Sequence, residues 1–307
     1  MPLGYAELEC FYEGLVTRAR AQGITCAITS GMACVAFGVA QTTKDCDVLC
    51  VPEAAERLLE LIHNTRLGEQ TPRYRGNLSP PLDARWLRGG WTSHFFWRTP
   101  DAEAYLDVFG LAPRGSTPWE AEVHGSYASQ HTVAEMKRTN REKDWPYVTA
   151  LGAQMLKERD PRGWLHIFDE DLIRSFLAET EIPAGLLRRR PVLQLALAND
   201  SRLRAALHAE RQLWHELDRV RIRIYERAVR QYMVAVRKTR IPEHEPLDAQ
   251  HRMRVECAQR HLPSYPIRDY GLDRMVAEAH QALAQLVHPA AMEWLPDVRE
   301  HFRNVTA

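Results

Sequence analysis

The sequence Asp45-Cys46-Asp47 places two carboxylates one residue apart in an otherwise apolar stretch. Successive side chains of a strand point to opposite faces, so Asp45 and Asp47 project from the same face of the strand expected over residues 45–51. They would stand roughly 6.6 Å apart and repel each other unless a cation lay between them. The alternative is a solvent-facing pair at a loop edge, which is the commoner fate of an isolated Asp-x-Asp pattern.

Small residues precede the carboxylate pair. Ser30 and Gly31 follow a short apolar strand expected over residues 24–29, and Thr43 comes just before the aspartates. Small residues at a strand-to-helix turn let backbone N–H groups and the helix N-terminus approach a phosphate. Mg²⁺ binds one or two carboxylates together with substrate phosphates, so the whole unit predicts a metal–phosphate site. Ser30 could also be the N-cap of the short helix, a role compatible with phosphate binding.

A third carboxylate, Asp107, lies in the sequence Tyr-Leu-Asp-Val-Phe-Gly. A second metal ion in such a site needs a further carboxylate, which also helps to activate an attacking hydroxyl group. Asp107 is the best candidate because it lies in another expected strand that can neighbour the first. The alternative is that Asp107 caps the turn at Gly110.

The first half of the chain alternates between helical and strand patterns. Residues 5–23 predict a helix that closes on Gly23, residues 32–40 a short helix ending near Gly38, and Pro52 opens a third. Residues 64–92 are rich in Pro, Gly, Arg and Asn and are expected to be irregular. Strands follow over 93–99 and 104–110, joined by a turn at Pro100-Asp101, and then helices over 132–138 and 145–158.

The second half predicts only amphipathic helices. The composition changes near residues 160–163, which gives an expected division into a 1–160 catalytic domain and a 161–307 helical domain. A helix near residues 205–239 carries one face of arginines: Arg219, Arg223, Arg227, Arg230 and Arg237. This face is interpreted as solvated and paired with acidic residues, with a phosphate-contacting groove for RNA as the alternative.

Composition is typical of a globular protein of 307 residues. Forty basic and forty acidic residues give no net charge, so bulk charge indicates neither a nucleic-acid nor a membrane partner. No signal-peptide pattern and no apolar run approaching ~20 residues occurs. The six cysteines form no Cys-x-x-Cys pair and are expected to be free thiols rather than disulfides or zinc ligands. We therefore expect a cytoplasmic protein; the sequence leaves its oligomeric state open.

Residues 28–50 resemble the signature of the nucleotidyltransferase superfamily, and most closely bacterial nucleotidyltransferase-like proteins related to abortive-infection toxins. The matching positions are Ser30-Gly31, Ala33, Gly38 and Thr43-Lys44-Asp45-Cys46-Asp47. A later helix Lys and an Arg-x-Lys-Asp sequence match as Lys137, Arg141, Lys143 and Asp144. Many relatives carry Arg where this chain has Gln41, and a larger aliphatic residue where it has Cys46. The likeness covers residues 24–156, and Asp144 could alternatively be the N-cap of the helix at Trp145-Pro146.

The resemblance implies an α+β fold, a mixed sheet with flanking helices, followed by the helical domain. It also implies a nucleotidyltransferase that uses Mg²⁺ or Mn²⁺ to transfer a nucleotide from a nucleoside triphosphate to a hydroxyl group of RNA, a protein or a small molecule. Asp45, Asp47 and Asp107 would bind metal and act in catalysis. Ser30, Gly31, Thr43, Lys137 and Lys143 would bind the phosphates, with Lys137 alternatively a solvated helix residue. Two alternatives stay open: an inactive binding or regulatory protein of the same fold, favoured by Gln41, and an RNA-binding helical protein.

Overall fold

The computed structural model describes residues 4–100, 102–242 and 245–306. Within these residues one mixed sheet has the strand order β3-β4-β5-β2-β1-β7-β6. Neighbouring strands are antiparallel except for the pairs β2–β5 and β1–β7, which are parallel. The strands are β1 (Cys26–Thr29), β2 (Asp45–Cys50), β3 (Arg73–Tyr74), β4 (Thr92–Arg98), β5 (Glu103–Phe109), β6 (Val123–His124) and β7 (Tyr127–Ala128).

Helices separate these strands and then follow them. The helices of the first half are α1 (Tyr5–Ala21), α2 (Ser30–Ala36), α3 (Ala55–His63), α4 (Ala84–Leu87), α5 (Gln130–Met136) and α6 (Trp145–Lys157). The later helices are α7 (Glu170–Leu177), α8 (Ala184–Arg189), α9 (Leu193–Leu197), α10 (Leu203–Ala228), α11 (Arg230–Thr239), α12 (Leu247–His261), α13 (Pro266–Tyr270), α14 (Leu272–Leu283) and α15 (Pro289–Met292). The expected α+β class with a mixed sheet is therefore confirmed.

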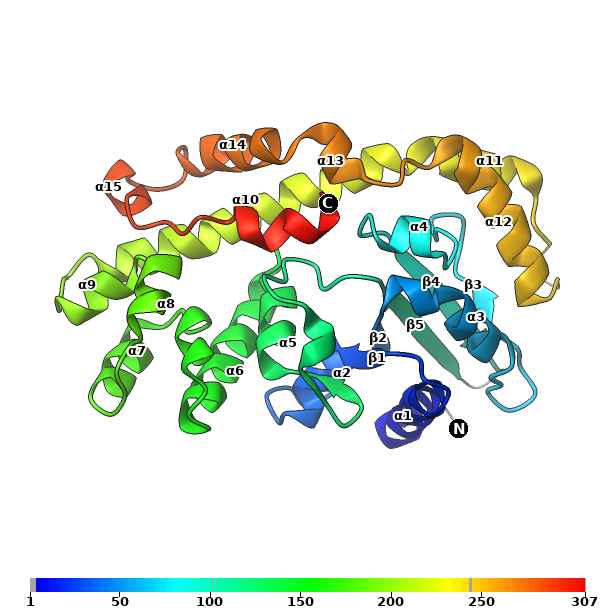
Figure 1. Cartoon of the computed structure of the whole chain (residues 1–307), viewed down its shortest axis with the longest axis horizontal. Coiled ribbons are helices and arrows are strands. Elements are labelled where there is room, and N and C mark those ends of the chain that lie inside the picture. Colours follow the sequence, from blue (N-terminus) through cyan, green and yellow to red (C-terminus); the bar gives the residue numbers. More distant parts are fainter. Residues whose placement is uncertain (1–3, 101, 243–244, 307) are drawn as a thin grey trace.

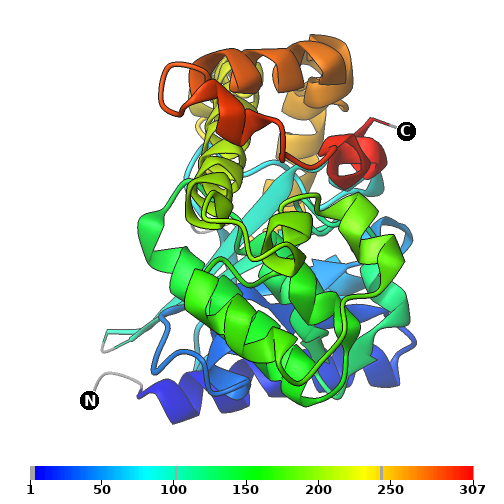
Figure 2. The same cartoon turned by 90° about the vertical axis from the view of Figure 1, so that its left-hand side faces the viewer.

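Figure 1 shows the sheet in one half of an elongated molecule, with the long helix α10 extending from α9 in the other half toward it and α14 alongside α10. In the view of Figure 2 the helices α13 and α14 lie at the end farthest from α1. The regular elements among the described residues after 160 are all helices, as expected. Trp145 of α6 packs in the same hydrophobic cluster as residues of α10 and α14.

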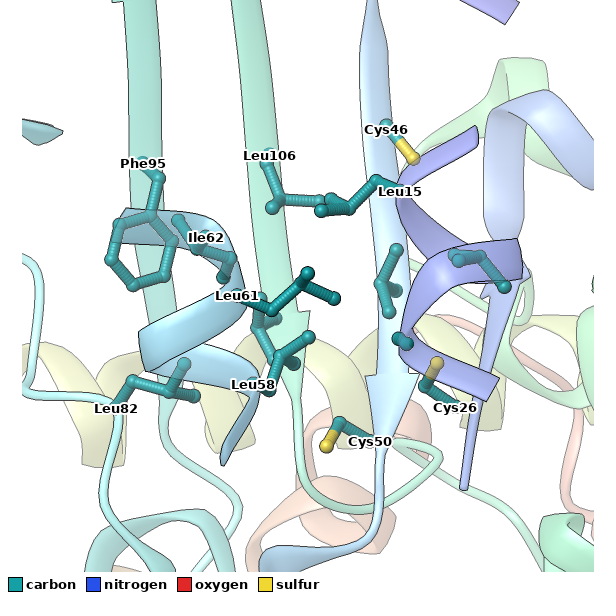
Figure 3. Close-up of a cluster of buried hydrophobic side chains, with 14 of the residues drawn as sticks. Leu15, Cys26, Cys46, Cys50, Leu58, Leu61, Ile62, Leu82, Phe95 and Leu106 are labelled. Carbon is teal, nitrogen blue, oxygen red and sulfur yellow. The ribbon is translucent and has the colours of Figure 1, made fainter. Parts of the chain in front are cut away.

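One face of the sheet carries the largest hydrophobic cluster, which α1 and α3 cover. Strand alternation directs Cys46 and Val48 of β2 into this cluster together with Leu106 of β5, because these residues have the opposite parity to the aspartates. Figure 3 shows Leu58 and Ile62 of α3 gathered with the same cluster. The core on this face therefore forces the carboxylates of β2 and β5 onto the other face.

Several expected elements differ from the structure. Residues 64–92, expected to be irregular, contain the two-residue strand β3 and the short helix α4, where Asp83 accepts a hydrogen bond from the Arg85 backbone. A strand of two residues is too short to show an alternation of apolar and polar side chains, and β3 is recognised only by its pairing with β4. The helix expected over 205–239 is two helices that meet at Val229. The strands expected over 93–99 and 104–110 are confirmed as the antiparallel pair β4–β5, whereas the expected turn includes residue 101, outside the described residues.

Candidate functional site

A cleft of about 550 Å³ on the other face of the sheet brings together all eight residues that the sequence singles out. These residues are Ser30, Gly31, Thr43, Asp45, Asp47, Asp107, Lys137 and Lys143. They come from the turn between β1 and α2, the loop before β2, the strands β2 and β5, the end of α5 and the segment before α6. Segments that lie far apart in the sequence therefore meet in one concave site.

The carboxylates occupy neighbouring positions of two parallel strands. Asp47 of β2 pairs in register with Asp107 of β5, and Asp45 begins β2 at an exposed position. Burial and, to a smaller extent, the charge of Asp107 raise the pKa of Asp47 from 3.8 to about 6. A hydrogen bond from Ser30 and the charge of Lys137 act in the opposite direction. The cleft therefore holds two mutually repelling carboxylates, an electrostatic setting that favours a bound cation.

Asp107 has two basic partners that the sequence did not indicate. Arg75 donates hydrogen bonds to its two carboxylate oxygens at 2.9 and 3.1 Å, and His94 Nδ1 lies 2.8 Å from the nearer oxygen. The alternative role of Asp107 as a cap for the turn at Gly110 is wrong, because Asp107 lies inside β5 and its carboxylate accepts hydrogen bonds from Arg75. Arg75 lies in a stretch expected to be irregular, and His94 gave no signal beyond its place in an alternating strand.

The donor set suits Mg²⁺ only in part. Among the residues that the structure describes, no group of three or more His, Cys, Asp or Glu side chains is arranged to hold a metal ion. Asp45 and Asp47 nevertheless line the same cleft, and Mg²⁺ needs only one or two carboxylates when substrate phosphates supply further oxygens. The geometry therefore fits a metal held by Asp45 and Asp47 together with phosphates, with Asp107 engaged by Arg75.

The turn after β1 is shaped by close packing. Thr29 is the N-cap of α2, so the N-cap role considered for Ser30 is wrong. Ser30 instead adopts a left-handed backbone conformation, with φ of 55°, and its side chain hydrogen-bonds Asp47. A Cβ atom on Gly31 would lie 2.6 Å from Thr43 Oγ1, so any larger residue there would force the Thr43 side chain to shift. The turn therefore stands directly against the carboxylate strand with its backbone uncovered by a side chain at Gly31.

Lys137 and Lys143 occupy different environments in the cleft. Lys137 is buried at the end of α5, which overturns its interpretation as a solvated helix residue, and its Nζ lies 3.5 Å from Asp144. Lys143 is exposed at the rim. Asp144 takes the N-cap position of α6, but its side chain accepts from Thr139 at 2.6 Å and Arg141 at 2.8 Å instead of capping the helix. Asp144 thus holds Lys137 and Arg141 in place, and these two residues form the basic wall of the cleft.

Two arginines missed by sequence reasoning complete this wall. Arg114 and Arg221 line the cleft, and both bind Asp218 of α10, at 2.6 and 3.0 Å. Burial acts to raise the pKa of Asp218, but the charges of the two arginines outweigh it and hold the pKa at about 2. Helix α10 therefore reaches the site from the second half of the chain. The i, i+3 spacing of Asp218 and Arg221 was the one available signal, and it does not reveal Arg114.

The arginine face of α10 and α11 lies outside the cleft. Arg219 pairs with Glu216, and Arg223 pairs with Glu278 of α14. Arg227, Arg230 and Arg237 are exposed. The two ion pairs agree with the interpretation of a solvated face paired with acidic residues.

Comparison with protein-family models, curated proteins and solved structures gives no match to this chain. Among the described residues, no helix combines the length and apolar character needed to cross a membrane. Five of the six cysteines, at positions 26, 34, 46, 50 and 257, are buried free thiols.

Proposed function

We propose that the cleft binds a nucleoside triphosphate with Mg²⁺ or Mn²⁺ and transfers its nucleotidyl group to a hydroxyl acceptor. One observation carries the proposal: Asp45 and Asp47 on β2 share a cleft with Asp107 on the adjacent parallel strand and with the Ser30-Gly31 turn. The likeness of residues 28–50 to nucleotidyltransferase signatures supports the same function. Of the possible acceptors, RNA, a protein or a small molecule, this cleft alone selects none.

Each group has a role that follows from its position. Asp45 and Asp47 would hold the metal, which neutralises phosphate charge and polarises the phosphoryl group under attack. The bare backbone at Gly31 admits a phosphate oxygen close to its N–H. Lys137 supplies a buried positive charge beside Asp47, where the leaving pyrophosphate accumulates negative charge. Asp107 accepts the proton of the acceptor hydroxyl, whose oxygen forms a bond to the α-phosphorus as the bond to pyrophosphate breaks.

A second candidate function is nucleotide binding without transfer. Arg75 and His94 engage the carboxylate of Asp107, so the residue assigned as base already has two basic partners. Gln41 also stands where many nucleotidyltransferases carry Arg. In this case the protein would bind a metal–nucleotide complex and act as a regulatory or partner protein.

A transfer assay separates the two candidates. The protein is incubated with each triphosphate, labelled at the α-phosphate, together with Mg²⁺ and total RNA or total protein from cells. We expect label to become covalently attached to one acceptor, with attachment lost in Asp107→Asn and kept in Asp273→Asn, a change at an exposed carboxylate of α14. Nucleotide binding with no covalent label under any condition would contradict transfer and support the second candidate.

A further inference from the structure

A second cavity, of about 350 Å³, shares no lining residue with the cleft but is linked to it by the hydrogen bonds between Arg75 and Asp107. It lies over the open face of β3, β4 and β5 and is closed by the segment after α11 and by α12. Arg75 lines this cavity while it donates its hydrogen bonds to Asp107 in the cleft. One side chain therefore separates the proposed metal site from the second cavity.

The sheet register shows how closely the two sites are joined. Asp45 of β2 pairs with Tyr105 of β5, and Tyr105 pairs with Phe96 of β4. The row Asp47–Asp107–His94 lies two residues further along the same strands, so both rows face the same way. Tyr105, which lines the second cavity, therefore lies beside Asp45, a proposed metal ligand of the cleft.

Arg254 of α12 supplies a buried positive charge to this cavity. It is 4% exposed, and its guanidinium donates to the backbone carbonyls of Ser79 at 2.9 Å and Gly76 at 2.7 Å. The guanidinium also donates to the Tyr232 hydroxyl at 3.4 Å and lies 4.8 Å from the ring centroid of Tyr74, and the described part of the chain places no carboxylate in ion-pair contact with it. A buried charge without a counter-charge is costly, and an anion in the cavity would offset that cost.

Aromatic rings and guanidinium groups alternate along the same floor. Arg75 lies over the ring of Tyr105 and Arg98 over the ring of Phe96, each 5.3 Å from the ring centroid. Arg98 also pairs with Glu103, and Arg75 pairs with Asp107, whereas no carboxylate of the described residues pairs with Arg254. Nucleobases stack on aromatic rings and on guanidinium planes, and phosphates seek unpaired cations. The combination therefore fits a nucleotide unit better than an acidic peptide, which would use only the charge.

We propose that this second cavity binds the terminal nucleotide of a single-stranded nucleic acid and presents its hydroxyl group to Asp107. The assignment of that nucleotide as acceptor rests on the proposed transferase function, whereas its binding does not. Arg254 would contact the phosphate, and Phe96 and Tyr105 would support the base. Arg75 would release the carboxylate of Asp107 and donate its hydrogen bonds to the acceptor phosphate instead.

Binding is measured by fluorescence anisotropy with a short labelled RNA and a DNA of the same sequence, on the full chain. Phe96→Ala and Arg254→Gln test the cavity; the second keeps a hydrogen-bond donor for the carbonyls of Ser79 and Gly76. We expect each to weaken binding by about tenfold, the loss of one stacked base or one phosphate contact. The double variant Arg223→Glu/Arg227→Glu, on the outer face of α10, is the matched control and should bind as the wild type does.

The outcomes separate the possible explanations. Binding of RNA but not DNA would identify RNA as the ligand. Equal binding of RNA and DNA would show that the protein recognises only base and phosphate. Either result supports nucleotide binding in the second cavity when Phe96→Ala and Arg254→Gln lower the affinity. Unchanged affinity in Phe96→Ala and Arg254→Gln, or a loss confined to the α10 variant, would overturn the proposal. So would a wild-type protein that binds neither oligonucleotide, or a glutamate-rich peptide that competes equally well. Triphosphate binding, measured separately in each variant, should stay unchanged, so failure of the proposed function is recognised independently.

Discussion

Asp47 of β2 lies directly beside Asp107 of β5 in the register of two parallel strands. The two carboxylates have different hydrogen-bond donors: Asp47 accepts a hydrogen bond from Ser30, whereas Asp107 accepts hydrogen bonds from Arg75. Packing fixes this arrangement, because the opposite parity of both strands is committed to the core under α1 and α3. We propose that this fixed pair of negative charges serves to bind a metal–nucleotide complex.

The raised pKa of Asp47 makes stability depend on pH. Its pKa rises from 3.8 to about 6 on folding, so between these values the folded state holds the proton more tightly and stability falls as pH rises. We expect Asp47→Asn to become more stable than the wild type as pH rises through this window, by up to about 3 kcal/mol near neutrality. Urea unfolding at a series of pH values, without divalent metal, measures the difference. A difference that stays constant with pH would contradict this account.

Gly31 should tolerate no side chain. Because a Cβ atom would lie 2.6 Å from Thr43 Oγ1, Gly31→Ala should lower the free energy of unfolding by about 1–3 kcal/mol and weaken triphosphate binding. Adding Thr43→Gly should restore much of the stability by removing the clashing atoms. Gly185→Ala is the matched control, because no atom lies within 4 Å of the added Cβ there. Equal behaviour of the Gly31 and Gly185 variants would show that the turn is not tightly packed.

The two lysines should contribute unequally to nucleotide affinity. Lys137 is buried beside Asp47, so its charge acts on a bound phosphate with little screening, whereas Lys143 is exposed. We expect Lys137→Met to weaken triphosphate binding by about tenfold or more, and Lys143→Met by only about twofold, with the second effect vanishing at high salt. Calorimetric titration at two salt concentrations measures both. A larger loss in the Lys143 variant would contradict the assigned positions of the phosphates.

Arg75 should compete with metal for Asp107. Its side chain satisfies both oxygens of the carboxylate, so Arg75→Gln would release one acidic group into the cleft. We expect the concentration of Mn²⁺ needed for half-saturation in the presence of triphosphate to fall severalfold. Arg88→Gln, which removes an exposed ion pair with Glu53, should leave it unchanged. Weaker metal binding in the Arg75 variant would mean that Arg75 organises the site rather than competes for it.

The sequence was informative about the site where local patterns decide the structure. Strand alternation alone places Asp45 and Asp47 on one face, and the apolar neighbours of Asp107 place it in a strand. The pairing of β2 with β5 could only be expected as possible, because it depends on contacts across more than fifty residues of chain. The resemblance to nucleotidyltransferases supplied the link between these segments and Lys137.

The partners of these residues were beyond local patterns. Arg75 reaches Asp107 from a segment whose two-residue strand has no signature of its own. Arg114 enters the cleft because Asp218, more than a hundred residues later, holds it there. Arg254 and Phe96 line the same cavity because α12 packs against β3 at the edge of the sheet. Such contacts are set by tertiary packing, so a single sequence does not reveal them.

The central claim is that Asp45 and Asp47 bind a metal–triphosphate complex, and calorimetric titration of each nucleoside triphosphate with and without Mg²⁺ tests it most directly. The account predicts binding of at least one triphosphate that requires Mg²⁺. That binding should disappear in Asp45→Asn/Asp47→Asn and persist in Asp273→Asn. Absence of metal-dependent binding for every triphosphate, or binding unaffected by the loss of both carboxylates, would contradict it.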